Sequence, residues 1–205
     1  MSTAAAKKLA GSARDRLLAA ANELFYEEGV HTVGIERVIE RAGVAKASLY
    51  STFGSKDELV HAYLQARADR RRRRISERIA RHPDARSRIL AIFDLMGELA
   101  ADPAFRGCAF YNASAEGPRK ESKASRVCDD QRSWTAALFT ELARDAGVAQ
   151  PARLGRQLVL LYDGAMVGAS MDRSPDAPAV AREMAEVLLD AEAPARGGKR
   201  RAPKT

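Results

Sequence analysis

Cationic and hydroxyl side chains are concentrated in a short stretch between residues 46 and 56. Lysine binds phosphate oxygens, and serine, threonine and tyrosine hydroxyls form hydrogen bonds with phosphates and with the edges of bases. The residues expected to contact nucleic acid are Lys46, Ala47, Ser48, Tyr50, Ser51, Thr52 and Lys56. The chemistry that this stretch favours is non-covalent recognition of double-stranded DNA.

The elements that would position these residues form a helix-turn-helix. One helix is expected over 35–42 and the next over 45–53, separated by Gly43, which permits the positive φ of a tight turn. A preceding helix is expected to end at Gly29, and Ser55 is the expected N-cap of a fourth helix. The apolar residues expected to close the small core are Ile35, Val38, Ile39, Val44 and Leu49.

This segment resembles the DNA-binding domain of the TetR family over residues 14–63. The family's order and spacing are matched by Ala42-Gly43-Val44, Lys46, Leu49-Tyr50, Phe53 and Ser55-Lys56. The resemblance implies that Lys46, Ser48 and Tyr50 lie on the recognition helix. It also implies that Lys56 contacts a phosphate at the start of the fourth helix.

Two features depart from this pattern or extend it. Many family members carry His followed by Tyr or His where this chain has Ser51 and Thr52, so its base preference is expected to differ. Lys7, Lys8 and Arg14 would form either an arm along the DNA backbone or minor groove, or part of a disordered tail.

The remaining reactive residue types lack the spacing that catalysis or metal binding requires. The three histidines stand outside any metal or triad motif, and the sequence holds no glycine-rich phosphate loop. Cys108 and Cys128 lack the neighbouring ligands of a zinc site, so buried reduced thiols are expected, with oxidant sensing by Cys108 as the alternative. We expect no enzyme activity, no metal site and no cofactor.

The composition favours a cytoplasmic protein with a polyanionic partner. The 205 residues carry 34 Lys and Arg against 27 Asp and Glu, a formal charge of +7. A genome of high GC content, in which a surplus of arginine is common, would give the same balance. No apolar run reaches the roughly 20 residues of a membrane-spanning helix, and residues 1–11 lack the apolar segment of a secretion signal.

Helical periodicity continues along the chain and predicts an all-α fold. A three-helix helix-turn-helix domain is expected over 12–60, followed by a larger helical bundle for ligand binding and dimerisation over 61–192. Residues 1–11 and 193–205 are small or basic and are expected to be flexible tails. The later helices are expected over 55–81, 86–100, 120–146, 151–171 and 179–191, with a short helix or irregular connection over 107–117.

The stretch 107–116 resembles a Gly-Cys-x-Phe-x-Asn-Ala-x-Ala-Glu segment of one TetR subgroup, in which it lies near the effector cavity. Apolar side chains with a few polar groups are typical of a small-molecule pocket. The residues expected to line it are Phe93, Met96, Cys108, Phe110, Asn112, Trp134, Leu138, Tyr162 and Met166. The effector is expected to be small and apolar or amphipathic, and a core position is the alternative for each residue taken singly.

Two apolar stripes near the C-terminus predict a homodimer. Two helices from each subunit would pack into a four-helix interface, and Gly164 and Gly168 would allow close approach. The residues expected at this interface are Leu154, Leu158, Leu161, Ala165, Gly168, Val180, Met184, Val187 and Leu188.

Five consecutive arginines, 70–74, encircle the predicted fourth helix and leave no apolar stripe there. They predict a solvated connector between domains. Contact with an acidic ligand, a partner or flanking DNA is the alternative.

Together these features predict a dimeric regulator on a pseudopalindromic operator, with its recognition helices in major grooves about 34–36 Å apart. An effector that binds the DNA-free form more tightly would release the operator, which describes a repressor. The alternative is a DNA-bound regulator without a small ligand, controlled by a partner protein or by cysteine oxidation. Activation in place of repression is compatible with the same features.

Overall fold

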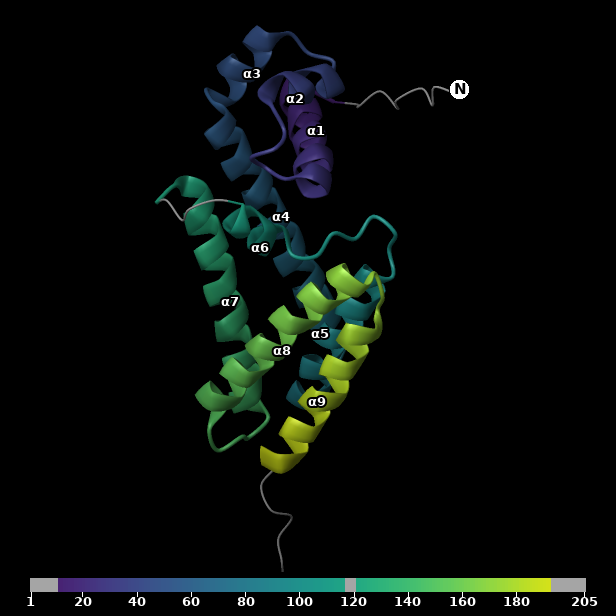
Figure 1. Ribbon diagram of the computed structural model, residues 1–205. Helices are drawn as coiled ribbons and strands as arrows, with labels where there is room; N and C mark the ends of the chain where they lie inside the picture. The colour runs from purple at the N-terminus through teal and green to yellow at the C-terminus, as the bar shows by residue number, and fades with distance from the viewer. Residues whose placement is uncertain (1–10, 117–120, 193–205) are drawn as a thin grey trace, which may run out of the picture. The chain divides into compact units, whose positions relative to one another are not determined.

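The computed structural model describes residues 11–116 and 121–192, which form nine helices and no strand (Figure 1). In chain order these are α1 (Ala13–Glu28), α2 (Ile35–Ala42), α3 (Lys46–Phe53), α4 (Lys56–Ile79), α5 (Ala85–Ala100), α6 (Ala109–Ala115), α7 (Lys123–Asp145), α8 (Pro151–Asp172) and α9 (Asp176–Glu192). The all-α prediction is confirmed. The predicted tails at 1–10 and 193–205, with the arm residues Lys7 and Lys8, lie outside the described residues.

Local signals in the sequence fix most helix ends. α2 occupies the predicted residues and ends at Gly43, whose φ of 62° is left-handed. Ser55 caps α4 as predicted, because its hydroxyl oxygen accepts a hydrogen bond from the amide of Glu58 at 3.2 Å. α9 begins at Asp176, about one turn earlier than predicted, because Pro178 in a first turn needs no amide donor.

The chain divides into two compact units. The first comprises the residues up to Arg73 together with Arg106–Arg132, and the second comprises Arg74–Phe105 together with the residues from Ser133 onward. Two of the three boundaries fall inside helices, within α4 and within α7, and the third lies between Phe105 and Arg106, in the segment that joins α5 to α6.

The core of the first unit is built around α1, which packs against α2 and α3. Leu17, Val38, Leu49 and Leu59 are fully buried in it. Three later residues belong to the same core, namely Ala109 and Phe110 of α6 and Val127 of α7. The helix-turn-helix is therefore completed by a segment far along the chain.

The second unit is built from α5, α8 and α9, which pack against one another, together with the later part of α7. α8 and α9 run antiparallel side by side (Figure 1). The aromatic rings of Phe93, Phe139 and Tyr162 form its centre, with Phe139 lying 5.9 Å from Phe93 and 6.0 Å from Tyr162 between ring centroids.

Candidate nucleic-acid interface

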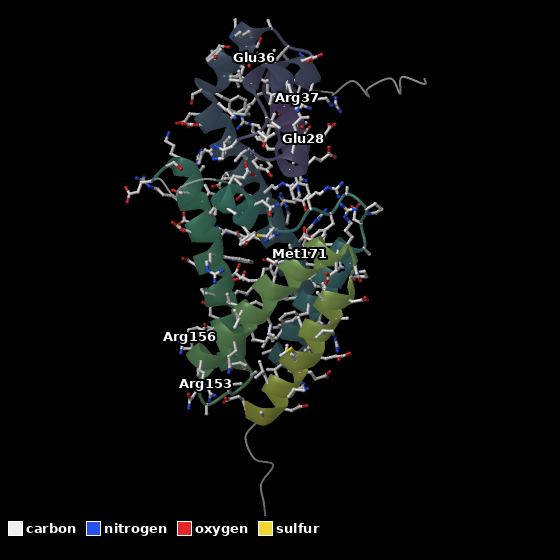
Figure 2. The ribbon with its side chains drawn as sticks, viewed as in Figure 1. Glu28, Glu36, Arg37, Arg153, Arg156 and Met171 are labelled. Carbon is white, nitrogen blue, oxygen red and sulfur yellow. The ribbon has the colours of Figure 1, made fainter. Side chains whose placement is uncertain are left out.

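Two arginines on α2 join it to α1. Arg41 donates to the carboxylate of Glu23 from Nε at 3.0 Å and from Nη2 at 2.7 Å. Arg37 makes the same two-pronged contact with Glu28, its Nη2 lying 2.8 Å from Oε1 (Figure 2). The geometry of a planar guanidinium on a carboxylate fixes both distance and orientation, so α2 is held in one position on α1.

The turn between α2 and α3 is held by backbone bonds and by one side chain. The amide of Gly43 donates to Glu40 O at 3.0 Å, and the amide of Val44 donates to Ile39 O at 3.3 Å. The carbonyl oxygen of Gly43 accepts a hydrogen bond from Nη1 of Arg16 at 3.1 Å. These bonds satisfy the end of α2 and set the direction in which α3 leaves.

α3 buries one side and exposes the other. Leu49 is fully buried, whereas the ring of Tyr50 is 46% exposed. Lys46, Ala47, Ser51 and Thr52 are exposed and Ser48 is half-buried. The structure thus places the α3 residues named as DNA contacts on the accessible part of one short helix, and their contact with DNA stays a prediction.

Two hydroxyl groups on α3, those of Ser51 and Thr52, use their protons locally. Thr52 donates to the carbonyl oxygen of Ser48 at 2.6 Å, and Ser51 donates to the same oxygen at 3.2 Å. Their oxygen lone pairs remain suited to accepting from base amino groups.

Lys46 carries the positive charge at the start of α3, and it faces an acidic neighbour. Its Nζ lies 3.4 Å from a carboxylate oxygen of Glu36 on α2. The pKa of the Glu36 carboxyl is lowered, first by a hydrogen bond from the backbone amide of Glu36 itself and then by the bond from Lys46. The carboxylate is therefore charged at neutral pH, and it would compete with a DNA phosphate for Lys46 if Lys46 contacts DNA as predicted.

Lys56 opens α4 and is half-buried. Asp57 and Glu58 follow it in the first turn, where negative charge is favoured by the helix dipole. Glu58 accepts a hydrogen bond from Nζ of Lys123 on α7 at 2.7 Å, which lowers the pKa of the Glu58 carboxyl. The charge of Glu58 is thereby partly offset beside the proposed phosphate-binding lysine.

The arginine run is not wholly solvated. Arg71 donates to the sulfur of Cys108 at 3.4 Å and lies over the ring of Phe110, and Nε of Arg72 donates to the side-chain oxygen of Gln131 at 2.9 Å. The prediction of a solvated connector is wrong at these two half-buried positions, because α6 and α7 supply partners that local sequence does not reveal. Arg70, Arg73 and Arg74 are exposed.

The residues predicted to line an effector pocket are divided between the two units. Phe93, Met96, Tyr162 and Met166 are buried in the second unit, where Trp134 and Leu138 are half-buried. Cys108, Phe110 and Asn112 belong to the first, where Nδ2 of Asn112 donates to Arg106 O at 2.8 Å. Their binding of an effector stays a prediction.

Two cavities are lined by other residues. The larger, about 580 Å³, lies in the first unit, where Val30, Val60, Leu64 and Cys128 contribute apolar lining and Lys56, Asp57 and Asp129 contribute charge. The smaller, about 280 Å³, lies in the second unit beside Arg74, Arg78 and Glu98. The larger cavity has the volume of a small-molecule site.

The cysteines are half-buried rather than fully buried, and no disulfide joins them. Both pack against the core of the first unit. Among the described residues, no group of His, Cys, Asp and Glu is arranged to hold a metal ion. No helix in the described ranges is long and apolar enough to cross a membrane.

The apolar stripes predicted to form a dimer interface are partly internal. Leu154 and Leu158 are fully buried and Ala165 is nearly so, which leaves their side chains no surface for a second subunit. A Cβ added to Gly168 would lie 2.9 Å from Cβ of Ala177, so the close approach there is within the chain. The prediction needs correction at these four positions, because a helix face buried in its own chain has the same periodicity as one buried in a partner.

Five large apolar side chains on the described parts of these two helices are exposed. On α8 they are Leu160 and Met171, and on α9 they are Val180, Met184 and Val187, with exposed fractions between 51% and 77%. Leu161 and Leu188 are half-buried. Three of the predicted interface residues are thus available on α9, and sequence analysis missed the two on α8.

Known proteins resemble this chain over most of its length. The tetR family of bacterial regulatory proteins is matched by residues 17–63. The crystal structure of SCO4454, a TetR-family transcriptional regulator from Streptomyces coelicolor, is 34% identical with a TM-score of 0.84, covering 89% of this chain and 96% of that one. A tetr-transcriptional regulator from Streptomyces avermitilis is 33% identical with a TM-score of 0.76, covering 89% and 98%.

A relative from another genus extends the comparison. The HTH-type transcriptional activator FasR of Mycolicibacterium smegmatis is 31% identical over 136 residues, which make up 66% of this chain and 61% of FasR. The matched region is thus less than two thirds of the length of that relative.

Proposed function

Since the chain belongs to the TetR family of bacterial regulatory proteins, we propose that it is a homodimeric repressor that binds a pseudopalindromic operator and leaves it when a small-molecule effector binds. The observation that carries the DNA-binding part is the accessible face of α3. There a lysine, two hydroxyls and a tyrosine ring project from a helix whose other side is anchored by Leu49. A helix of this kind fits a major groove.

Two lysines have different proposed roles from the α3 hydroxyls. Lys46 and Lys56 supply charge to phosphates, which strengthens binding to any sequence and makes it sensitive to salt. Ser48 and Tyr50 would meet base edges, which distinguish one sequence from another.

Fluorescence anisotropy with genomic fragments selected for binding tests the proposal. Lys46→Met should weaken binding to all duplexes and reduce the salt-dependence slope by about 1. Tyr50→Phe should weaken binding to the selected fragment and leave binding to bulk competitor unchanged. Arg144→Gln, a charge change at an exposed position of α7, is the matched control. If no fragment binds better than bulk competitor, the proposal fails.

The homodimer is supported by the exposed apolar side chains of α8 and α9. Val180, Met184 and Val187 recur at helical spacing on one face of α9. On α8, Leu160 and Met171 are three turns apart and share one face with Gly164. Antiparallel α8 and α9 from two copies would bury both faces in a four-helix interface.

Analytical ultracentrifugation tests the homodimer. Val187→Glu should raise the dimer dissociation constant by about tenfold or more, because a carboxylate would be buried without a partner. Ala137→Glu introduces the same charge at an exposed site on α7 and should leave association unchanged. A wild-type chain that sediments as a monomer at micromolar concentration would contradict this part.

Release by an effector is supported by the family and by the presence of a cavity of small-molecule size. A different observation favours a second candidate, a DNA-bound regulator without a small ligand. Phe93 and Tyr162, predicted pocket residues, pack against Phe139 at ring-contact distance. Native mass spectrometry of the protein from its host, followed by operator binding with and without any co-purified molecule, distinguishes the two candidates.

The relative FasR is named a transcriptional activator, which favours activation as the alternative to repression. In vitro transcription from the promoter nearest the selected operator distinguishes activation from repression. A repressor lowers transcript yield when added, and an activator raises it.

A further inference from the structure

The loop that joins α1 to α2 has an unusual start. α1 ends at Gly29, whose φ of 99° and ψ of 151° form a conformation that side chains disfavour. Directly after it, the backbone amides of Val30 and His31 both point to one carboxylate, that of Glu116 at the end of α6. Val30 N lies 3.1 Å from Oε1 and His31 N lies 2.8 Å from Oε2.

The carboxylate of Glu116 packs directly against Gly29. A Cβ added at Gly29 would lie 2.9 Å from the carboxyl carbon and from both carboxyl oxygens of Glu116. The glycine therefore supplies the backbone conformation and the space that the carboxylate occupies. Each carboxylate oxygen accepts a hydrogen bond from one amide, and these charge-assisted bonds are stronger than two neutral hydrogen bonds.

The other end of α6 is tied to the same helix. The hydroxyl of Tyr26 on α1 accepts a hydrogen bond from the amide of Arg106 at 2.9 Å and donates one to Gly107 O at 3.0 Å. The guanidinium of Arg67 lies 3.6 Å from the centre of the Tyr26 ring. The residues at both ends of α6 are thus hydrogen-bonded to the last turn of α1 or to the loop that follows it.

The bonded loop determines where the helix-turn-helix begins. Val30 and Val33 are buried in the core, Val33 N bonds to Gly29 O at 3.3 Å, and α2 starts two residues later at Ile35. A shift of this loop would move the start of α2, and α3 follows α2 after a single tight turn. The carboxylate of Glu116 therefore acts on a loop directly connected to the proposed DNA-binding helices.

We propose that Glu116 is a positioning residue for operator recognition, which sets the orientation of α2 and α3 through the amides of Val30 and His31. It lies outside residues 17–63, the segment matched by the family description. Movement of α6 that withdraws the carboxylate would release both amides and loosen the loop. α6 is thereby a route by which changes elsewhere in the chain reach the DNA-binding surface. This inference rests on the proposed DNA-binding function.

Glu116→Gln is the variant that tests it. The amide keeps the size of the side chain, but its NH₂ group faces a backbone donor, so only one of the two bonds survives. We expect affinity for the selected operator to fall by about tenfold or more. Binding to a mixed-sequence duplex should change less than twofold, because phosphate contacts tolerate small changes in orientation.

The ratio of the two affinities separates positioning from general stability. A purely structural role would lower both affinities in parallel with the fraction of folded protein and leave their ratio unchanged. Glu121→Gln removes the same charge at an exposed site of the first unit and should leave both affinities as in the wild type. Circular dichroism at the binding temperature establishes that each variant is folded.

Glu116→Asp provides a second variant if Glu116→Gln does not fold. It keeps the charge but is one methylene shorter, so it reaches fewer of the amides and should give an intermediate loss of discrimination. In the wild type, the amides of Val30 and His31 should exchange with solvent deuterium more slowly than the amide of Thr32.

The results distinguish failure of the proposed function from failure of the positioning role. A wild-type chain that shows no sequence preference overturns the proposed function itself. Wild-type discrimination with an unchanged affinity ratio in the folded Glu116 variants overturns the positioning role and leaves the function standing. Fast exchange of both amides in the wild type also overturns the positioning role.

Discussion

The guanidinium of Arg16 on α1 donates a hydrogen bond to the carbonyl oxygen of Gly43, 27 residues away, over 3.1 Å. This bond joins the first helix to the turn of the helix-turn-helix. Because Gly43 lies three residues before the start of α3, the bond restrains the direction in which the recognition helix leaves the turn and also stabilises the turn.

Arg16→Gln should therefore affect both stability and DNA binding. Loss of a hydrogen bond from a charged donor should lower the free energy of unfolding by about 1–2 kcal/mol, measured by urea titration. Operator affinity should fall about threefold to tenfold by anisotropy, since α3 becomes less restrained. Arg16→Lys, which retains a cationic donor, should lose less of each. Equal operator affinities for Arg16→Gln and the wild type would refute the link.

Glu36→Gln should strengthen DNA binding. Glu36 and Lys46 form an ion pair with side chains 72% and 63% exposed, so the pair contributes little to stability. Removing the carboxylate eliminates a repulsion from phosphate and releases Lys46. We expect a gain in operator affinity of about twofold to fivefold at low salt, fading as salt screens the charges.

The comparison for Glu36→Gln is Glu27→Gln, an equal charge change at an exposed position near the end of α1. Anisotropy titrations over a salt series should show no gain for Glu27→Gln. Because the pKa of Glu36 is lowered, the gain should be constant across the neutral pH range. A similar gain in both variants would assign the effect to net charge alone.

Tyr63 should make the protein sensitive to alkali. Its side chain is 2% exposed, and burial raises its pKa from 10.0 to about 12. Because the pKa is higher in the folded state than in the unfolded chain, the protonated Tyr63 contributes to folding stability. This contribution is fully present below pH 10 and is lost as the pH rises to about 12. A rise of this size in the pKa of Tyr63 corresponds to about 2–3 kcal/mol of folding stability.

Tyr63→Phe isolates this contribution, because phenylalanine keeps the ring and has no ionisable group. Urea unfolding at a series of alkaline pH values should show a steeper loss of stability for the wild type than for Tyr63→Phe, with a difference of about 2–3 kcal/mol across the window. Parallel curves would mean that Tyr63 ionises in the folded protein as readily as in the unfolded chain.

Much of the helix-turn-helix is predictable from sequence, because its determinants are local. Gly43 at a left-handed turn, Ser55 at an N-cap and the apolar spacing around Leu49 act over a few residues, and each is observed where predicted. The composition of α3 also identifies its accessible face without knowledge of the rest of the chain.

The contacts that sequence analysis missed join residues far apart in the chain. Glu116 and His31 are 85 residues apart and Arg72 and Gln131 are 59 apart, so no local pattern announces either pair. The apolar stripes were ambiguous for another reason. Leu158 on α8 and Val187 on α9 belong to apolar stripes with the same helical periodicity, yet Leu158 is buried in its own chain and Val187 is 67% exposed.

Two glycines of α8 should respond oppositely to the same substitution. A Cβ at Gly155 would lie 3.0 Å from Cα of Thr140 on α7, so Gly155→Ala should force two helices apart and cost about 1–3 kcal/mol. A Cβ at Gly164 would meet no atom within 4 Å. Gly164→Ala should therefore stabilise the helix by about 0.5–1 kcal/mol, because alanine loses less backbone entropy on folding.

Urea unfolding and sedimentation together decide what each glycine does. Gly164 shares a face of α8 with the exposed Leu160 and Met171, the face proposed to meet a second subunit. If that face is the interface and α8 of the partner approaches closely, Gly164→Ala should stabilise the dissociated chain yet weaken the dimer. Gly155 is buried, so Gly155→Ala should lower stability of the single chain first. Stabilisation of both chain and dimer by Gly164→Ala would place the closest approach between subunits elsewhere on α8 and α9.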